Sequence, residues 1–346
     1  LGPIDQYLGS PIKIKIDGNT KLVNIYYKTD PQAEALQWLS PEQTSGGKLP
    51  FLFTQSQAIL ARSWVPIQDS PGIRFTYEAK VTVPSNLLAL MSAENPQEKN
   101  DDGVYHFKMD KPIPAYLLAL AVGDLTFEAI DERTGVYAEP DMIEKAAYEF
   151  AETGNMLEAS EDLYGPYQWE RYDLLVLPPS FPFGGMENPR LTFATPTILA
   201  GDRSLTSLVA HEMAHSWSGN LVTNATWNDF WLNEGFTVYF ENRIMEEIYG
   251  RSYAEMLANL SLQDLKREIE SLNDKGQAAD TKLKLALKGR DPDDGMTSIA
   301  YDKGCFFLVA LEEKVGRQAF DAFLRKYFED NAFKSMDTES FIAYAN

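Results

Sequence analysis

The sequence has one cysteine, three histidines, no long apolar run and no excess of basic residues. With Cys305 alone, neither an intramolecular disulfide nor a cysteine-rich metal cluster can form. The longest apolar stretch, residues 115–122, is too short to cross a bilayer. Acidic residues outnumber basic ones 51 to 31, which gives a net charge of -20. That charge repels phosphate backbones and anionic lipids, so we expect no nucleic-acid partner and no membrane insertion.

The two ends of the sequence and its single cysteine lead to three further expectations. The first residue is Leu1, so we expect the N-terminal domain to be incomplete at its start. Asp337 has the character of a helix N-cap, and the helix it predicts stops within two turns, as at a cut. A single cysteine favours a reducing, cytoplasmic setting, with a periplasmic or secreted protein as the open alternative.

The length of 346 residues predicts two or three domains, and 44% hydrophobic content is typical of a folded protein. Up to Leu125, glycine and proline interrupt short apolar runs that alternate with polar residues. Alternation of this kind predicts half-buried strands, here over residues 13–16, 22–27 and 75–83. We therefore expect a β-rich domain over residues 1–125.

From residue 126 onwards the apolar spacing changes to intervals of three and four, which predicts helices. The segments with this spacing are residues 142–164, 204–218, 230–249 and 301–328, and a short apolar strand is predicted at 174–177. The expected fold class is therefore α+β, with a mainly helical second domain over residues 126–346.

The chemistry of the chain is concentrated in His211-Glu212-Met213-Ala214-His215. On a helix this spacing places both imidazoles on one face, where they can reach a single metal ion, with Glu212 near a water on that ion. The alternative is a purely structural role, in which the two histidines form hydrogen bonds inside the core and bind no metal. Apolar neighbours on both sides make two buried imidazoles and a carboxylate costly unless something coordinates them.

A metal site needs at least one further protein ligand, and Glu234 is the candidate. Eighteen residues separate it from His215, and it opens the next predicted helix within an apolar frame. The alternative is a first-turn carboxylate favoured by the helix dipole. Glu241 lies seven residues further along the same helical face, where it is either an acceptor for a ligating imidazole or a solvated surface residue.

These motifs, in this order, resemble the gluzincin zinc aminopeptidases related to aminopeptidase N. The resemblance rests on the histidine pair, the eighteen-residue gap, the sequence Asn-Glu-Gly-Phe at 233–236 and Gly-Gly-Met-Glu-Asn at 184–188. Residues 177–189, 227–235 and 35–46 are similar, more narrowly, to the leukotriene A(4) hydrolase branch. The resemblance covers almost the whole chain and implies a β-rich, saddle-like first domain and a thermolysin-like catalytic domain.

The resemblance also implies roles for individual residues. One zinc ion per chain would be held by His211, His215 and Glu234, with a fourth position for a water. Glu212 would be the general base, and Tyr301 would donate a hydrogen bond to the oxyanion.

Substrate contacts follow from the same resemblance. Glu187, assisted by Gln57, would bind the free amine of a short peptide. Gly184, Gly185 and Met186 precede this glutamate, and the two glycines suit close approach to an extended substrate. Asp293 matches a pocket aspartate that the family links to basic first residues and to epoxide opening, whereas an acidic residue beside proline more often caps a turn.

Some positions depart from the family pattern. Met296 replaces a pocket tyrosine of the vertebrate hydrolase, and Phe236 replaces a histidine. The C-terminal helical domain of the family is absent from this sequence. The function that the sequence predicts is a zinc aminopeptidase acting on short peptides. The alternatives are a leukotriene-type epoxide hydrolase, alone or as a second activity, a thermolysin-like endopeptidase, and an inactive zincin scaffold.

Overall fold

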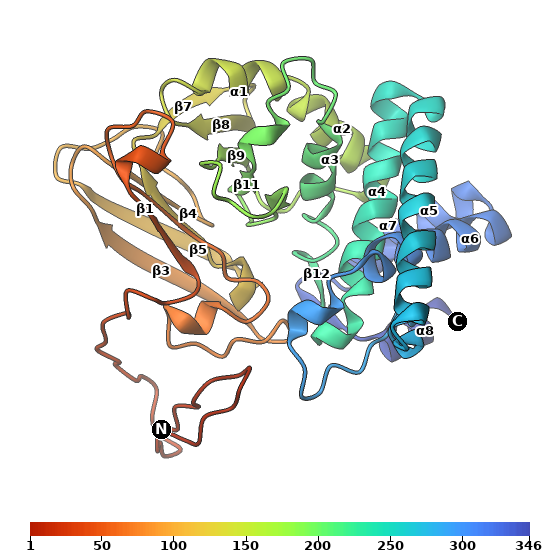
Figure 1. The fold of residues 1–346 in the computed structure, drawn as a ribbon, viewed down its shortest axis with the longest axis horizontal. Helices are drawn as coiled ribbons and strands as arrows, with labels where there is room; N and C mark the ends of the chain where they lie inside the picture. The colour runs from red at the N-terminus through yellow and green to blue at the C-terminus, as the bar shows by residue number, and fades with distance from the viewer.

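The computed structural model describes residues 1–346 and joins a strand-rich part to a helical part (Figure 1). The predicted α+β class, with strands first and helices afterwards, is confirmed. The first sheet has the order β1-β2-β6-β4, and β3 pairs with β5 in a long antiparallel ribbon beside it. The bounds of these strands are β1 Leu36–Leu39, β2 Phe51–Thr54, β3 Arg74–Thr82, β4 Leu88–Met91, β5 Val104–Pro114 and β6 Leu120–Gly123.

A second sheet lies between this strand-rich part and the helices (Figure 1). Its order is β10-β11-β9-β8-β7, and β8, β9 and β11 run parallel while both edge strands are antiparallel. A separate parallel pair, β12 with β13, ties two segments more than a hundred residues apart. The bounds are β7 Thr126–Ala129, β8 Thr134–Ala138, β9 Tyr172–Val176, β10 Gly185–Met186, β11 Thr192–Ala194, β12 Val222–Asn224 and β13 Lys334–Met336.

Eight α-helices complete the fold, and none of them combines the length and apolar character needed to span a bilayer. In Figure 1 the long helices α4 and α5 run side by side, and α3 lies between them and the second sheet. The bounds are α1 Ile143–Glu149, α2 Thr153–Tyr164, α3 Ser207–Ala214, α4 Trp231–Tyr249, α5 Arg251–Asp274, α6 Gly304–Val315, α7 Arg317–Asp330 and α8 Thr338–Ala345.

Two predicted strands, over residues 13–16 and 22–27, are wrong, because both segments are irregular coil. The strand predicted at 75–83 is present as β3. Alternation produces a strand only where a neighbouring strand pairs with its backbone groups, and none lies beside these two segments. Their apolar side chains are accordingly exposed, and Tyr26 is 95% accessible.

The predicted helices exist, but several are shorter or interrupted. The segment at 142–164 is split between α1 and α2 by a turn, and the one at 301–328 opens as a π-helical turn and breaks at Gly316. Gly316 has φ of +88°, a left-handed conformation that glycine adopts without strain. The helix predicted after Asp337 is present, and the Asp337 side chain accepts the Ser340 N–H.

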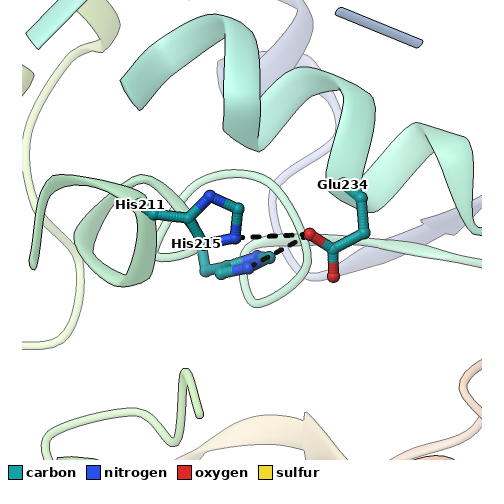
Figure 2. Close-up of side chains that lie close together, drawn as sticks. All are labelled: His211, His215 and Glu234. Atoms are coloured by element: carbon teal, nitrogen blue, oxygen red, sulfur yellow. Dashed lines mark ion pairs between the residues drawn. The ribbon is translucent and has the colours of Figure 1, made fainter. Parts of the chain in front are cut away.

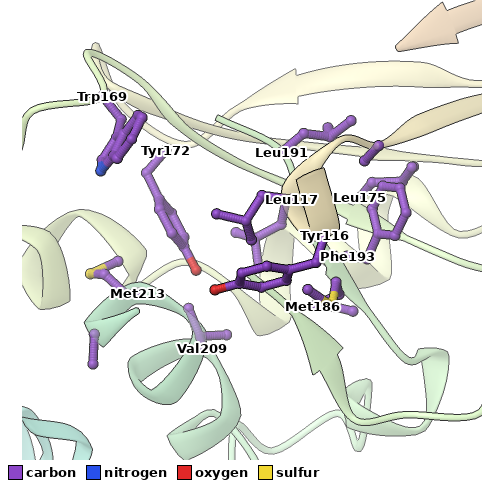
Figure 3. Packing of buried hydrophobic residues seen from close by; sticks show 14 of the residues in the cluster. Tyr116, Leu117, Trp169, Tyr172, Leu175, Met186, Leu191, Phe193, Val209 and Met213 are labelled. Carbon is purple, nitrogen blue, oxygen red and sulfur yellow. The ribbon is translucent and has the colours of Figure 1, made fainter. Parts of the chain in front are cut away.

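The two parts share one hydrophobic core, a cluster of 71 buried residues that reaches from β1 to α8. Figure 3 shows the cluster where residues of the second sheet meet Tyr116 and Leu117 from the first part and Val209 and Met213 from α3. Arg74 of β3 adds polar contacts across the same boundary, since its guanidinium donates to the carbonyls of Asn220 and Leu221. A shared core of this kind holds the two parts in a fixed relation.

Helix α4 crosses the start of α6 at a contact between two glycines. A Cβ on Gly304 would lie 2.7 Å from the Cα of Gly235, and one on Gly235 would lie 2.7 Å from the Cα of Gly304. Because both obstructing atoms belong to backbone, no side-chain movement can relieve the clash. The crossing positions Glu234, one residue before Gly235, relative to Tyr301 in the π-helical turn.

Replacement of Gly304 by alanine should therefore destabilise the protein by about 1–3 kcal/mol, the usual range for overpacking. Chemical unfolding of the purified variant measures this. Gly18→Ala is the matched control, because a Cβ at Gly18 meets nothing within 4 Å. Equal stability of the two variants would contradict the close crossing.

Candidate active site

Helix α3 carries the histidine pair on the face that it turns towards α4. His211 and His215 are one helical turn apart, and their ring centroids lie 4.9 Å from each other. Val209, Ala210, Met213 and Ala214 pack into the core around them. The helix is therefore held by apolar burial while its two imidazoles converge on one point.

Glu234, in the first turn of α4, meets both imidazoles (Figure 2). Its Oε2 lies 3.4 Å from Nε2 of His211 and 3.6 Å from Nε2 of His215. Three atoms bound to zinc at about 2.0–2.1 Å in a tetrahedron lie roughly 3.3 Å apart. The spacing of these three atoms therefore approaches that of zinc ligands before any ion is considered.

The other ring nitrogen of each histidine is held by a neighbour. His211 Nδ1 lies 3.0 Å from Oε2 of Glu241, and His215 Nδ1 lies 3.0 Å from the carbonyl oxygen of Ser218. A carbonyl only accepts, so His215 Nδ1 carries the proton and its Nε2 presents a lone pair towards Glu234. Glu241 thus lies in the acceptor position suggested by its place on the helix.

The donor set fits a divalent metal ion. Oε2 of Glu234 is buried and makes no hydrogen bond in spite of its two imidazole neighbours. Imidazole nitrogens and a carboxylate oxygen are the ligand types of catalytic zinc sites, which keep a fourth position open. The ligand atoms of His211, His215 and Glu234 all lie within 4.8 Å of one another.

Glu212 lies beside this group without joining it. Its side chain is buried, and Oε2 has no hydrogen-bond partner. Burial raises the pKa of its carboxyl well above the ordinary value; the nearby charge of His211 opposes the rise, and that of Glu187 adds to it. A Cβ at Gly185 would lie 2.2 Å from Oε1 of Glu212, so the glycine provides the room that this carboxylate occupies.

Tyr301 reaches the group from the π-helical turn at Ile299–Lys303. Its ring lies parallel to that of His211, with centroids 6.3 Å apart. Burial raises the pKa of its hydroxyl well above 10, and the charges of Glu234 and Glu187 act in the same direction. The hydroxyl therefore keeps its proton at neutral pH and is available as a hydrogen-bond donor.

Glu187 follows the edge strand β10 and is only 4% exposed. Its Oε1 has no hydrogen-bond partner, and its backbone carbonyl accepts from Nδ2 of Asn220 at 2.8 Å. Burial raises the pKa of this carboxyl, and the charge of Glu234 adds to the rise. Ligand atoms of Glu187, Glu212 and His215 lie within 4.8 Å of one another, so the unpartnered carboxylate faces the same space as the histidine pair.

These side chains line one cleft of about 620 Å³. The cleft brings together most of the residues predicted from the sequence: Gln57, Gly184, Gly185, Glu187, His211, Glu212, His215, Glu234 and Tyr301. Met296 also lines it, so the position where the chain departs from the vertebrate hydrolase is part of the wall.

Two predicted substrate residues do not line the cleft. The side chain of Met186 is buried in the core, where its sulfur accepts from Gln55, because alternate residues of a strand face opposite sides. Asp293 is also absent from the lining, since it lies in a short turn capped by Asp291. Burial raises the pKa of its carboxyl, and the backbone N–H of Ala58, the residue after Gln57, opposes that rise.

Several residues at the site were missed in the sequence. Asn233 lies 2.9 Å and Thr237 3.0 Å from Nδ1 of His215, and Asn220 holds the Glu187 backbone. Asn233 and Thr237 lie one turn apart on α4, so helical spacing from Glu234 could have suggested both. The sequence around Asn220 does not indicate its role, because its partner Glu187 lies 33 residues away.

A further carboxylate, Asp302, lines the cleft behind Tyr301. Burial raises the pKa of Asp302 to about 6, the hydroxyls of Ser298 and Ser261 oppose the rise, and the charges of Asp264 and Glu241 add to it. This carboxylate is charged at neutral pH at a cost to the folded state.

Comparison with known families and proteins gives consistent matches over both parts of the chain. Residues 148–345 match the peptidase family M1 domain, and residues 6–117 match the peptidase M1 N-terminal domain. Leucine aminopeptidase 2 of Yarrowia lipolytica is 45% identical over 99% of this chain and 54% of its own length. The chain therefore spans about half the length of this curated relative.

Solved structures agree with the sequence matches. Leukotriene A4 hydrolase from Saccharomyces cerevisiae superposes with a TM-score of 0.86 at 42% identity, covering 92% of this chain and 50% of that one. An M1 zinc metallopeptidase mutant from Deinococcus radiodurans, bound to a Tyr-Ser-Ala substrate, gives a TM-score of 0.70 at 25% identity, over 85% of this chain and 65% of that one.

Removal of one imidazole should abolish metal binding. We expect His215→Ala to lose bound zinc while the parent retains it through dialysis, because two remaining ligands no longer enclose an ion. Elemental analysis of both proteins measures this, with His106→Ala as control, since His106 is exposed on β5. Full zinc occupancy in His215→Ala would contradict the assignment of His215 as a metal ligand.

The pKa of Asp302 predicts a pH-dependent effect on stability. Because this pKa rises from 3.8 to about 6 on folding, the folded state binds more protons than the unfolded state between these values. The contribution of Asp302 to the free energy of unfolding therefore falls as the pH rises from about 4 to about 6. Asp302→Asn should raise the free energy of unfolding by about 1 kcal/mol near pH 7.5, a figure discounted for solvent screening, and by much less near pH 4. A gain of equal size at both pH values would show that the carboxyl is not perturbed.

Proposed function

The chain belongs to peptidase family M1, and from this membership we propose that it is a zinc-dependent aminopeptidase that hydrolyses the N-terminal peptide bond of short peptides. The observation that carries the proposal is the position of Glu187. This buried carboxylate has an unpartnered oxygen and faces the same cleft as the histidine pair and Glu212.

We propose one zinc ion per chain, held by His211, His215 and Glu234. The spacing of their ligand atoms and the unpartnered Oε2 of Glu234 support this assignment. When bound, zinc supplies Lewis-acid polarisation of the scissile carbonyl and lowers the pKa of a water molecule. Glu241 and the Ser218 carbonyl keep the two rings oriented with Nε2 towards the ion.

Glu212 is the proposed general base. It takes a proton from the attacking water and delivers that proton to the nitrogen of the leaving amine. Its burial in the cleft raises the affinity of the carboxylate for a proton, which suits a group that must accept one near neutral pH.

Tyr301 is the proposed donor to the oxyanion that forms as the scissile carbonyl is attacked. Its raised pKa keeps the hydroxyl protonated, and its ring is fixed against His211 and Phe230. One donor of this kind contributes about 3–4 kcal/mol to the stability of the transition state.

Glu187 is the proposed anchor for the free α-amine. An ammonium that enters the cleft loses its water and gains a buried carboxylate, which fixes the substrate with its first residue beside Glu187. Beside it, β10 is an edge strand whose outer side faces the cleft at Gly184 and Gly185. An extended peptide can pair with that edge, and its first peptide bond then lies next to Glu212.

Epoxide hydrolysis is the second candidate, because the chain resembles leukotriene A4 hydrolase of yeast. Met296 in the cleft wall offers no hydroxyl or charge to a polar reaction centre, which favours the peptidase over the epoxide hydrolase. Turnover of an epoxide but not of aminoacyl amides would reverse this order, and the absence of both activities would leave the zincin scaffold.

Replacement of Glu187 by alanine should reduce kcat/KM for aminoacyl amides by an amount equivalent to about 2–5 kcal/mol, while zinc stays bound. The reason is that the substrate ammonium would be buried without its partner. Acetylated substrates should not be cleaved by the parent at all. Steady-state kinetics with fluorogenic amides, with and without a chelator, measure both effects.

Glu212→Gln serves as the matched control, since it should keep zinc and lose turnover on every substrate, whereas Glu187→Ala loses only what the amine contributes. If acetylated and free peptides were cleaved equally well, the amine site would not exist and an endopeptidase would be the better description.

A further inference from the structure

A short loop follows the second histidine of the pair and leads into β12. It comprises residues 216–221, and all of them are buried. The N–H of Asn220 donates to the carbonyl of His215 at 3.0 Å, and the N–H of Gly219 donates to the carbonyl of Val222 at 2.8 Å. Gly219 has φ of +106°, and a Cβ there would lie 2.5 Å from Oδ1 of Asn233. The loop is therefore packed closely against the first turn of α4.

This loop contacts both the proposed metal site and the proposed amine anchor. The carbonyl of Ser218 accepts from Nδ1 of His215 at 3.0 Å, and the Ser218 hydroxyl donates to the carbonyl of Asn233 at 2.7 Å. Two residues further on, Nδ2 of Asn220 donates to the carbonyl of Glu187 at 2.8 Å. The metal ligands and the amine anchor are thus joined through one buried loop.

The hydrogen bond from Asn220 satisfies a carbonyl that the sheet leaves unpaired. Strand β10 ends at Met186, and Glu187 lies one position past the last pair between β10 and β11. The side chain of Asn220, itself 2% exposed, supplies the partner of the Glu187 carbonyl. A buried carbonyl without a hydrogen bond is costly, so this contact fixes the backbone of Glu187. Because the carboxylate extends from that backbone, its placement depends on the same contact.

The loop is held in turn by two segments outside the cleft. Arg74 of β3, in the strand-rich domain, donates to the carbonyl of Asn220 at 2.9 Å and to that of Leu221 at 3.1 Å. The carbonyl of Leu221 also accepts the N–H of Phe333, just before β13, at 2.7 Å. The strand-rich domain therefore supports the loop from which the Glu187 backbone is held.

We propose that Asn220 is a positioning residue for recognition of the substrate amine. Its side-chain amide holds the Glu187 backbone to the loop that orients His215, and so keeps the amine anchor at one distance from the metal site. The inference rests on the proposed aminopeptidase function, because it assigns what positions the amine anchor of that function. The place of the first substrate residue relative to the scissile bond is thereby set by this loop and not by Glu187 alone.

The test compares two hydroxamates that differ only in the amine: leucine hydroxamate and 4-methylpentanohydroxamic acid. Both ligate zinc, but only the first presents an ammonium to Glu187. Asn220→Ala should weaken the binding of leucine hydroxamate about tenfold, the size expected for one lost hydrogen bond. Binding of the other compound should not change, because the loop contacts His215 through backbone groups, which alanine retains. Inhibition constants, zinc content and thermal unfolding are measured on the zinc-loaded proteins.

Asn331→Ala is the matched control. Asn331 is also a buried asparagine, and its Nδ2 donates to the carbonyl of Tyr327 at 2.9 Å at the end of α7. This variant loses the same kind of hydrogen bond and should bind both hydroxamates as the parent does. Equal loss of affinity for both compounds in Asn220→Ala would overturn the proposal, because it would indicate a disturbed metal site.

A double-mutant cycle with Glu187→Gln tests whether Asn220 acts through Glu187. If it does, Asn220→Ala should weaken leucine hydroxamate far less in the Glu187→Gln background than in the parent. Additive effects would overturn the proposal. If Asn220→Ala fails to fold, Asn220→Ser replaces it, because a serine hydroxyl is one bond shorter than the asparagine amide and does not reach the same carbonyl. The same selective loss for the amine-bearing compound is expected.

The parent protein separates failure of this inference from failure of the proposed function. A parent that binds the two hydroxamates equally has no amine site, which overturns the role of Glu187 and this inference with it. If the parent prefers leucine hydroxamate and Asn220→Ala keeps the whole of that preference, only the role of Asn220 is overturned.

Discussion

The structure depends on the burial of like charges at one point. Four glutamates, Glu187, Glu212, Glu234 and Glu241, converge with two histidines in a single cleft. Carboxylates this close and this poorly hydrated cannot all remain ionised unless positive charge joins them. In the function proposed here, a divalent ion would supply two positive charges and a substrate ammonium a third. Burial is the main reason why the pKa values of Glu187 and Glu212 are raised, and the neighbouring carboxylates add to the rise.

Such a balance requires a rigid scaffold, and the fold supplies it by close packing between elements. Helix α4 meets α6 at two glycines, α3 meets the edge strand β10 where Gly185 makes room for Glu212, and one apolar core runs through both domains. At the two glycine contacts, the absence of a side chain allows the elements to approach closely. Charged groups held in this way keep their separation, because the surrounding packing resists compression.

The local chemistry of the site could be predicted from the sequence, since His211, Glu212 and His215 share one helix and Glu234 opens the next. The supports from distant segments could not: Tyr116 meets Asn233 across 117 positions, and Asn220 meets Glu187 across 33. The two strands wrongly predicted before residue 30 have the same cause. Alternation of apolar and polar residues is a property of one segment and does not show whether a partner strand is present. Parallel pairing of β8, β9 and β11 and the long helix α5 also went unpredicted, as did the displacement of Asp293 from the cleft.

The open edge of β10 limits which polypeptides such an enzyme can engage. Pairing along a strand edge uses only main-chain N–H and C=O groups, so it is indifferent to the side chains of the incoming peptide. It does demand that those groups be free. In a segment that already forms a helix or sheet, these groups are hydrogen-bonded to each other. Unfolding such a segment costs more free energy than a few hydrogen bonds to the strand edge contribute. For the proposed aminopeptidase, we therefore expect folded proteins to be poor substrates and unstructured peptides to be preferred.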